Sequence, residues 1–371
     1  MKWCNTCVLP STRPNLVINN RGVCNACEQG KVKKKINWEK RKLEFENLVR
    51  RTKKKKAEYD CLIPVSGGKD SFWQVVIALE YGLKPLTLTW RTPERTLIGE
   101  KNLKNLVSLG VNHIDFTINP KIESKFMLKT FEKSGSPLVP MHLAIYNLPV
   151  RVAHSFKIPL IIWGENSAFE YGGLKNDFGA NVNDKWIKKY GATNQTNAKN
   201  WISKTFTEKD LSPYMMPKRS ILNEFDVEGI FLGYFFKWDP INTMKIAKKN
   251  GFFYEKSNLK TGLYDFADID DNLISIHHWM KWYKFGFTRY FDNLSIEIRN
   301  NRIKRKHAIE KLKKIGDQRP NEDIEKFCKL TDINKSEFEK KSEKFRNKKI
   351  WFLDGKKWKI KDFLIDDWIW K

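Results

Sequence analysis

The feature that most constrains the fold is an alternation of short apolar runs with helical patterns between residues 59 and 164. The apolar runs are bounded by turn residues and are predicted strands at 59–65, 84–90, 112–118 and 158–164. Helical patterns separate these runs at 70–82, 99–110 and 140–157. Strands and helices in turn predict an α/β fold, a doubly wound parallel sheet covered by helices on both faces.

Three further segments complete the predicted secondary structure. A charged, helix-compatible segment spans 37–51, and a loop-rich stretch at 171–213 is expected to form an insertion or a lid. Aromatic residues and helices dominate from Ile221 onward. Residues 294–315 are predicted to form one long helix that stops at Gly316. We therefore expect the sheet to be followed by a mainly helical C-terminal region.

Four of the six cysteines lie in two C-x2-C pairs near the N-terminus, as Cys4, Cys7, Cys24 and Cys27. Each pair can place two thiolates on one tight turn, and two such turns complete the tetrahedral sulfur shell of structural zinc. Disulfides are the alternative, but they need an oxidising compartment that nothing in the sequence indicates. We expect a small N-terminal zinc-binding module, and we expect Cys61 and Cys328 to be packed core thiols.

The first predicted strand runs into S-G-G-K-D-S, residues 66–71. A glycine-rich turn between a parallel strand and a helix is a site for nucleotide phosphates, because backbone N–H groups and the helix N-terminus carry partial positive charge. Gly67 and Gly68 allow the backbone to curl. The side chains able to contact phosphate are Ser66, Lys69 and Ser71. Asp70 repels phosphate and is expected to be a magnesium ligand or a helix N-cap.

The loop has two other possible interpretations. Its spacing differs from G-x4-G-K-[ST], so it is not the P-loop of ordinary ATPases and GTPases. A polar turn without a ligand is the remaining alternative.

A second polar segment follows the fourth predicted strand, with the sequence G-E-N-S-A-F-E-Y-G-G at 164–173. Ligands of parallel sheets bind at the carboxyl ends of the strands, where this segment begins. Carboxylates at that edge can hold magnesium, or bind an ammonium ion or a sugar hydroxyl. A plain turn is the alternative.

The loop resembles the S-G-G-x-D-S signature of the PP-loop ATP pyrophosphatases. The resemblance implies a sheet domain of the adenine-nucleotide alpha-hydrolase type, with ATP and Mg2+ as cofactors. It also implies that a substrate oxygen is adenylated, that pyrophosphate leaves, and that a nucleophile then displaces AMP. On this basis the expected ATP-binding residues are Ser66, Gly67, Gly68, Lys69, Asp70, Ser71, Trp90 and Gly164.

With the paired cysteines and the 164–173 segment, the loop is similar to the N-acetyl sugar amidotransferases of bacterial surface-polysaccharide and flagellin-glycan pathways. Further matching blocks lie at 232–239, 261–271 and 284–305, so the resemblance covers nearly the whole chain. One departure is Phe287-Thr288-Arg289, where a more glycine-rich turn is expected.

The resemblance implies a specific reaction. ATP adenylates the carbonyl oxygen of an N-acetyl group, ammonia adds to the carbon, and AMP leaves to give an acetamidino sugar. Lys69, Asp70 and Glu165 are the expected catalytic residues, with Lys69 stabilising phosphate charge and the two carboxylates binding magnesium. The residues expected to bind the sugar are Asn166, Glu170, Tyr234, Trp238 and Asp271. The alternative is equally compatible with the sequence, namely that the aromatic residues belong to the core and the carboxylates are solvated.

The nucleophile separates two candidate functions. Thiolation of tRNA by related enzymes needs an additional cysteine pair or three cluster-binding cysteines, and only Cys61 and Cys328 remain beyond the zinc ligands. A glutaminase needs a nucleophilic cysteine at a strand–helix elbow or at the mature N-terminus. Position 2 is lysine, and Cys61 has no elbow glycines around it, so this chain is not expected to hydrolyse glutamine itself. We expect ammonia from a separate glutaminase and a channel subunit of the histidine-biosynthesis type, as the resemblance implies. Thiolation of tRNA is the alternative.

Composition and charge bound the class of protein. Hydrophobic residues make up 41% of the chain, as in globular proteins. No apolar run approaches the roughly 20 residues that span a bilayer, and the N-terminus lacks a signal-peptide core, so a cytoplasmic protein is expected. The formal net charge of +26 predicts either a polyanionic partner or a compositional bias with solvated helical faces.

These features divide the chain into four expected domains. They are a zinc-binding module at 1–30, a basic helical connector at 31–56, an ATP-binding α/β domain at 57–220 and a helical substrate- or partner-binding region at 221–371. The connector holds 13 basic residues against 3 acidic ones.

Overall fold

The computed structural model of the chain describes residues 1–370, with the side chains of residues 219, 221 and 223 outside the description. At its centre is a sheet of five parallel strands in the order β3-β2-β1-β4-β5. The strands are β1 (Cys61–Pro64), β2 (Pro85–Trp90), β3 (Asn112–Phe116), β4 (Leu160–Trp163) and β5 (Glu228–Phe231). The predicted α/β fold and its four predicted strands are confirmed. The sequence did not reveal the short fifth strand, β5.

The strand order places β1 directly beside β4, although about a hundred residues separate them in the chain. From β1 the sheet continues to β2 and β3 on one side, and to β4 and β5 on the other. Such a reversal leaves a crevice at the carboxyl ends of the two central strands, where nucleotides bind in doubly wound sheets. Both polar segments that the sequence singled out begin at this edge, which we call the switch-point edge.

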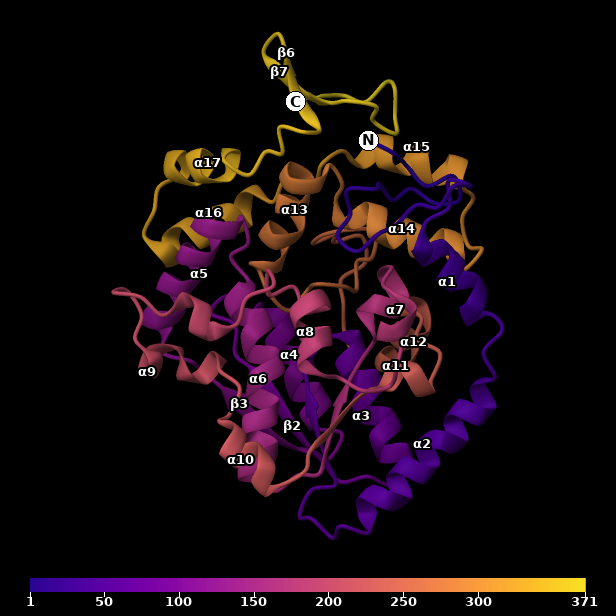
Figure 1. The fold of residues 1–371 in the computed structure, drawn as a ribbon, viewed down its shortest axis with the longest axis vertical. Coiled ribbons are helices and arrows are strands. Elements are labelled where there is room, and N and C mark those ends of the chain that lie inside the picture. The colour runs from indigo at the N-terminus through magenta and orange to yellow at the C-terminus, as the bar shows by residue number, and fades with distance from the viewer. Residues whose placement is uncertain (371) are drawn as a thin grey trace.

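Helices cover both faces of the sheet, as the alternation of side chains along parallel strands requires (Figure 1). Leu62 and Ile161 belong to a core cluster with α6 (Val139–Ser155), which contacts β1, β2 and β4. Cys61 and Ile63 point the other way, into a second cluster with α3 (Lys69–Glu80). The other helices of this part are α4 (Leu97–Val107), α5 (Pro120–Ser134), α11 (Leu232–Phe235) and α12 (Pro240–Lys249).

The segment expected to form a loop-rich insertion or lid has little regular structure but is anchored in the core. Trp186, Trp201 and Phe206 are buried, and the last two pack against Phe126 of α5 with ring centroids 5.6 and 5.3 Å apart. The short elements between β4 and β5 are α7 (Ser167–Tyr171), η1 (Lys175–Asp177), α8 (Asp184–Tyr190), η2 (Ala198–Trp201), α9 (Glu208–Leu211), η3 (Ser212–Tyr214) and α10 (Arg219–Glu224).

The two ends of the chain lie together over the carboxyl side of the sheet. Figure 1 shows the N-terminal coil, in indigo, beside the orange helices α14 and α15. The Met1 ammonium lies 3.2 Å from Asp362, and the Trp3 indole donates to the Asp362 carbonyl. The elements of these two regions are α1 (Asn25–Lys33), α2 (Trp38–Lys53), α13 (Ile274–Phe285), α14 (Arg289–Arg299), α15 (Arg305–Ile315), α16 (Asn321–Thr331), α17 (Lys335–Glu343), β6 (Trp351–Asp354) and β7 (Lys357–Ile360).

The prediction of one long helix over 294–315 is wrong, because the chain breaks between Arg299 and Arg305. Asn301 has the left-handed φ of 60°, a conformation that asparagine tolerates and that ends an α-helix. Arg302 then turns back to bind Glu297 and Asp239. The break allows α15 to fold against α14.

Along residues 1–370, the structure contains no helix that combines the length and the apolar character needed to cross a membrane.

A buried ion pair joins the N-terminal part to the sheet domain. Lys33, at the end of α1, lies 2.5 Å from Glu170 of α7 and donates to the Trp238 carbonyl at 2.7 Å. Both side chains are about nine-tenths buried, and burial lowers the pKa of Lys33. A buried pair of this kind is costly to break from one side, because the remaining charge has no partner.

We predict that Lys33→Met destabilises the chain by about 3–5 kcal/mol in urea unfolding, while Lys33→Met with Glu170→Leu lies nearer the wild type. The matched control is Arg51→Ala, which removes an ion pair with Glu228 in which the Arg51 side chain is 63% exposed. The control is expected to cost at most about 1 kcal/mol. A Lys33→Met variant no less stable than the control would contradict this account of the interface.

Candidate active site

The loop at 66–71 is closed by its own serine side chains. The Ser66 N–H donates to Ser71 Oγ at 2.9 Å, and the Gly68 N–H donates to Ser66 Oγ at 3.2 Å. Gly68 is the N-cap of α3 and supplies no side-chain cap. The first N–H groups of α3 are therefore available to an anion at the switch-point edge.

Gly67 is required by two independent constraints. Its φ of 86° lies in the left-handed region, and a Cβ there would come within 2.9 Å of the Leu103 backbone nitrogen and 3.1 Å of the Gly99 carbonyl oxygen. The loop thus packs closely against the first two turns of α4.

Lys69 and Asp70 form an ion pair at the start of α3. Lys69 is buried, and Asp70 Oδ1 accepts a hydrogen bond from the Trp238 indole at 2.9 Å. Of the two roles expected for Asp70, the N-cap position belongs to Gly68 instead. The role of magnesium ligand stays a prediction.

Gly164 and Glu165 lie beside this pair, at the end of β4. A Cβ on Gly164 would meet Gln74 Oε1 at 3.3 Å and Asp70 Cβ at 4.0 Å. Burial, together with the neighbouring Asp70 carboxylate, raises the pKa of Glu165 to about 7. The structure thus brings Lys69, Asp70 and Glu165 together, as the strand order requires.

Asp70 and Glu165 fit a role in holding magnesium, since hard cations prefer carboxylate oxygens. Among the described residues, the four N-terminal cysteines form a group of potential metal ligands whose atoms lie within 4.8 Å of one another, and the two carboxylates do not belong to such a group. A magnesium ion held by these two carboxylates would take its other ligands from ATP phosphates and water, as is usual for Mg2+.

The C-terminal region faces this edge with a group of buried and partly buried polar residues. We call Asp268, His278, Lys281, Arg289 and Asp292 the C-terminal polar cluster. Asp268 Oδ2 lies 3.5 Å from His278 Nε2 and 3.6 Å from Arg289 Nε. Asp292 lies 3.5 Å from Lys281 and accepts from Arg13 of the N-terminal module at 2.7 Å.

Electrostatic coupling places the cluster next to the catalytic candidates. Burial tends to raise the pKa of Asp268, but His278, Arg289 and Lys69 outweigh it and hold the pKa low. Arg289 in turn lowers the pKa of Glu165 against the effect of burial. Burial lowers the pKa of His278 to about 4, so its imidazole is neutral near pH 7. Lys281 is also affected by burial, which lowers its pKa to about 8.

Segment 268–272 is fixed to the chain that follows β2. The Thr96 N–H donates to the Asp270 carbonyl, and the Asn272 N–H donates to the Glu94 carbonyl. Asp271 accepts from Thr92 Oγ1 at 3.0 Å and from the Leu273 N–H at 2.9 Å. Burial raises the pKa of Asp271 to about 7.

The residues expected to bind the sugar make internal contacts in this structure. Asn166 caps α7 and also binds the Trp186 indole and two carbonyls, so its side chain is fully used. Tyr234 lies under the Arg41 guanidinium at 3.3 Å, while Glu170 is paired with Lys33. Trp238 holds Asp70. These contacts assign stabilising roles to the residues, and their role in substrate binding is untested.

Trp90, one of the expected ATP-binding residues, lies at the carboxyl end of β2. Its indole donates to Glu123 of α5 at 2.7 Å, and Tyr214 donates to the same oxygen at 3.3 Å. Burial raises the pKa of Glu123 to about 8. The edge of the indole is thus held inward by a carboxyl group.

The four N-terminal cysteines form a compact buried cluster. Cys4 Sγ lies 4.0 Å from Cys27 Sγ, and Cys7 Sγ lies 3.7 Å from Cys24 Sγ. Tetrahedral zinc with Zn–S bonds of about 2.3 Å needs sulfur separations of about 3.8 Å, so these residues fit the ion. Arg299 is partly buried beside them. Burial opposes its charge, but the nearby Cys7, Cys27 and Cys24 raise its pKa. Its cation offsets the negative charge of a four-thiolate site.

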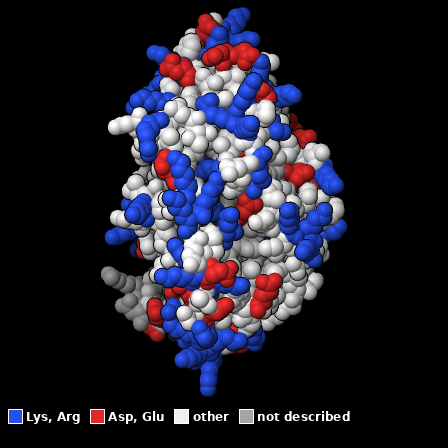
Figure 2. Space-filling view, turned by 90° about the vertical axis from the view of Figure 1, so that its right-hand side faces the viewer, with Lys and Arg blue, Asp and Glu red and all other residues white. Residues whose placement is uncertain are grey.

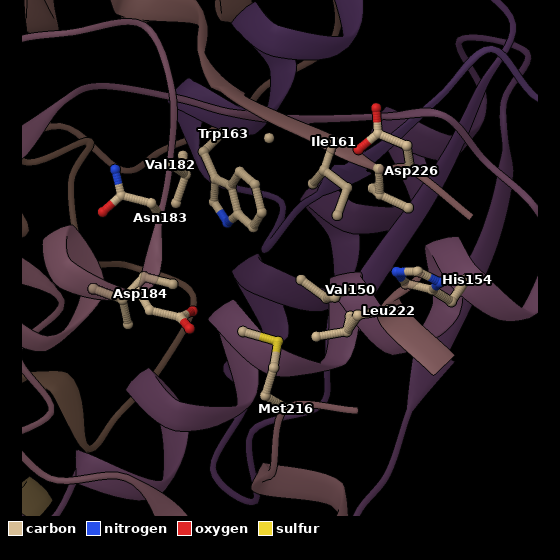
Figure 3. Close-up of a pocket in the computed structure, with 13 residues that line it drawn as sticks. Val150, His154, Ile161, Trp163, Val182, Asn183, Asp184, Met216, Leu222 and Asp226 are labelled. Carbon is tan, nitrogen blue, oxygen red and sulfur yellow. The ribbon is translucent and has the colours of Figure 1, made fainter. Parts of the chain in front are cut away.

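Figure 3 shows a different cavity, of about 210 Å³, on the α6 side of β4 and β5. Trp163, His154 and Met216 line it, with Asn183 and Asp184 from the start of α8. It includes no residue of the loop or of the C-terminal polar cluster, so it is separate from the candidate active site.

Sequence reasoning missed the C-terminal polar cluster, although most of its members lie in blocks that it singled out. The side chains of His278, Lys281 and Arg289 occur among aromatic residues in ordinary helical patterns. Their convergence depends on how α13 and α14 pack, which no local pattern reports.

Residues 252–364 match the family model described as "LPS biosynthesis protein WbpG-like, C-terminal domain". Residues 252–364 are thus similar to the C-terminal domain of WbpG-like proteins. The match confirms the resemblance drawn from the motifs, and it spans the blocks at 261–271 and 284–305. The whole C-terminal polar cluster lies within the WbpG-like domain.

Two other comparisons complete the picture. The structure of NMN synthetase from Francisella tularensis aligns over 60% of this chain and 100% of that chain, with 13% identity and a TM-score of 0.27. No curated protein matches the sequence.

We predict that the purified chain contains one zinc ion, measured by elemental analysis. Cys24→Ser combined with Cys27→Ser should abolish zinc binding and lower the melting temperature, because structural zinc contributes directly to folding. Cys328→Ser, at a buried thiol on α16, is the control that retains the metal. Absence of zinc from the wild-type chain would refute the assignment.

We predict that Mg2+-dependent affinity for a non-hydrolysable ATP analogue rises with pH between about 6 and 8. The reason is that Glu165, with its pKa raised to about 7, must lose a proton before it can bind a cation. Glu165→Gln should be weaker and should flatten this pH dependence, measured by isothermal titration calorimetry. An unchanged pH profile in Glu165→Gln would remove Glu165 from the magnesium site.

The same carboxyl group affects stability with the opposite sign. Its pKa is higher in the folded than in the unfolded state, so its contribution to stability is present at low pH and is lost as the pH rises from about 4.5 to 7. Glu165→Gln should therefore gain stability relative to the wild type as the pH rises through that window, as thermal unfolding in the absence of nucleotide and magnesium can measure.

Proposed function

We propose that this protein is an ATP-dependent amidotransferase that converts the N-acetyl group of a sugar into an acetamidine for surface-polysaccharide or glycan biosynthesis. The observation that carries the proposal is the meeting of two parts at one edge. The S-G-G-K-D-S loop and Glu165 lie at the switch-point edge, and the charged residues of the WbpG-like domain face them.

The loop supports the adenylation step. The N–H groups at the start of α3 and the Lys69 ammonium can bind the phosphates and stabilise the charge that develops as pyrophosphate leaves. Bound magnesium would neutralise further phosphate charge, held by Asp70 and Glu165. The carbonyl oxygen of the N-acetyl group attacks the α-phosphorus, which gives an O-adenylyl imidate and pyrophosphate.

The second step replaces the adenylyl oxygen with nitrogen. Ammonia adds to the imidate carbon, the nitrogen loses a proton, and the C–O bond to AMP breaks to leave the acetamidine. The proton can pass to His278, which is neutral near pH 7 and whose Nδ1 atom has no hydrogen-bond partner in the described residues.

The cysteines support an external source of ammonia. All six are buried, and burial raises the pKa of Cys61, so this thiol is a poor glutaminase nucleophile. We propose that a separate glutaminase delivers ammonia through a channel subunit of the histidine-biosynthesis type, and that the enzyme works in the cytoplasm.

Thiolation of tRNA remains the second candidate because the chain is strongly basic. On the face in Figure 2, Lys and Arg side chains extend over the whole height, with acidic side chains between them. Cys61 and Cys328, the thiols outside the zinc cluster, belong to different core clusters, so nothing favours them as a sulfur-carrying pair.

The test is an AMP-release assay on the full chain with Mg2+, ATP and ammonium chloride. One arm contains N-acetylated sugars and nucleotide sugars, and the other contains bulk tRNA with a sulfide donor. We expect AMP and pyrophosphate that depend on both ammonia and a sugar. Asp70→Asn should reduce the rate at least about 100-fold, and Asp366→Asn, at an exposed carboxylate, should not.

AMP formation that depends on tRNA and sulfide would favour thiolation. Formation of ADP in place of AMP would exclude the adenylation chemistry altogether.

A further inference from the structure

Arg289 carries a partly buried guanidinium whose Nε makes no hydrogen bond in the described residues. Its side chain is 20% exposed, and its nearest carboxylate oxygen, on Asp268, is 3.6 Å from Nε, beyond hydrogen-bonding distance. Nε itself is buried and has no hydrogen-bond partner in the part of the chain that the structure describes. A guanidinium carries five N–H donors in a planar fork that matches carboxylate and phosphate, so an unpaired buried one calls for an anionic ligand.

The adjacent helix end provides a second, independent indication. Arg289 is the first residue of α14, whose N-cap Thr288 makes no side-chain capping hydrogen bond. Thr288 is 2% exposed, and its Oγ1 is buried without a partner in the described residues. The positive end of an eleven-residue helix thus lies beside a hydroxyl and a guanidinium Nε that have no hydrogen-bond partner in the described residues.

The remaining charges of the C-terminal polar cluster do not cancel this positive site. Asp292, in the first turn of α14, is bound by Arg13 and lies 3.5 Å from Lys281. Arg13, Lys281 and Arg289 face Asp268 and Asp292 here, and the Glu165 carboxyl group, which also acts on Arg289, is assigned to magnesium. The Arg13 and Arg289 guanidinium carbons each lie 5.5 Å from the centroid of the Tyr171 ring.

The site is next to the candidate active site but has its own position. Arg289 acts on the pKa of Glu165 and of Tyr171, both of which follow β4. The phosphates of ATP have the loop, the start of α3 and Lys69 at the end of β1. Because ATP phosphates already have these donors, we assign an anion at α14 to the other substrate.

We infer that Thr288, Arg289 and the amino-terminal end of α14 bind an anionic group of the sugar substrate, either a carboxylate or a phosphate. The substrate class is then an acidic or phosphate-linked N-acetyl sugar in place of a neutral one. This inference rests on the proposed function for the identity of the second substrate as an N-acetylated sugar.

The test is calorimetric binding to the full chain in the presence of Mg2+ and α,β-methylene ATP, which needs no turnover. The probes are neutral N-acetylglucosamine, its 1-phosphate, UDP-N-acetylglucosamine and N-acetylneuraminic acid, so phosphate and carboxylate sources are separated. We expect at least one anionic probe to bind about tenfold or more tightly than the neutral sugar. Arg289→Gln should abolish that difference, while Arg289→Lys retains part of it because it keeps the charge without the fork.

Two controls keep the result interpretable. Arg319→Gln removes an arginine of the same domain with similar solvent exposure, 27% against 20%, that is paired with Glu339. This variant should leave sugar binding unchanged. Because Arg289 lowers the pKa of Glu165, the second control is run at about pH 9, where Glu165 is ionised with or without Arg289. There, affinity for α,β-methylene ATP in Arg289→Gln should stay within about twofold of the wild type, which also reports that the chain is folded.

Three outcomes would overturn the inference. No anionic probe binds the wild type more tightly than the neutral sugar, Arg289→Gln keeps the preference, or Arg289→Gln loses the nucleotide analogue instead. Failure of the proposed function has a different signature, in which anionic sugars bind through Arg289 but no ammonia-dependent AMP is formed.

Discussion

The pairing of β1 with β4 is the constraint on which the rest of the structure depends. The segments that follow the two strands are far apart in the sequence. The parallel pairing nevertheless places Gly164 against Asp70 and Gln74. Backbone donors, a lysine and two carboxylates are thereby concentrated at one edge. The raised pKa of Glu165 follows from this crowding, because burial and the Asp70 charge both disfavour ionisation.

The N-terminal module is built into this arrangement. Lys33 of α1 pairs with Glu170 and donates to the Trp238 carbonyl, and the Trp238 indole donates to Asp70. Arg13 reaches Asp292 in the C-terminal polar cluster. Zinc bound by the four cysteines would therefore stabilise contacts that position residues at the switch-point edge, without a direct part in the reaction.

The sequence was informative where a short pattern determines a local structure. The strand-helix alternation predicted the sheet, and the C-x2-C spacing predicted the cysteine cluster, because each depends on neighbouring residues. The break at Asn301 was missed since a left-handed asparagine within a charged helical pattern carries no distinct signal. Arg289 and His278 were missed as site residues because only the packing of α13 and α14 brings them to Asp268, and no spacing along the chain encodes that contact.

The central claim is that the oxygen of an N-acetyl group attacks the α-phosphorus of ATP at the switch-point edge. The most direct measurement uses an accepted sugar with an oxygen-18 label in its acetyl carbonyl, followed by mass spectrometry of the nucleotide formed. The account predicts that the label appears in AMP, because the carbonyl oxygen leaves with the phosphorus. Unlabelled AMP together with a labelled sugar product would contradict it.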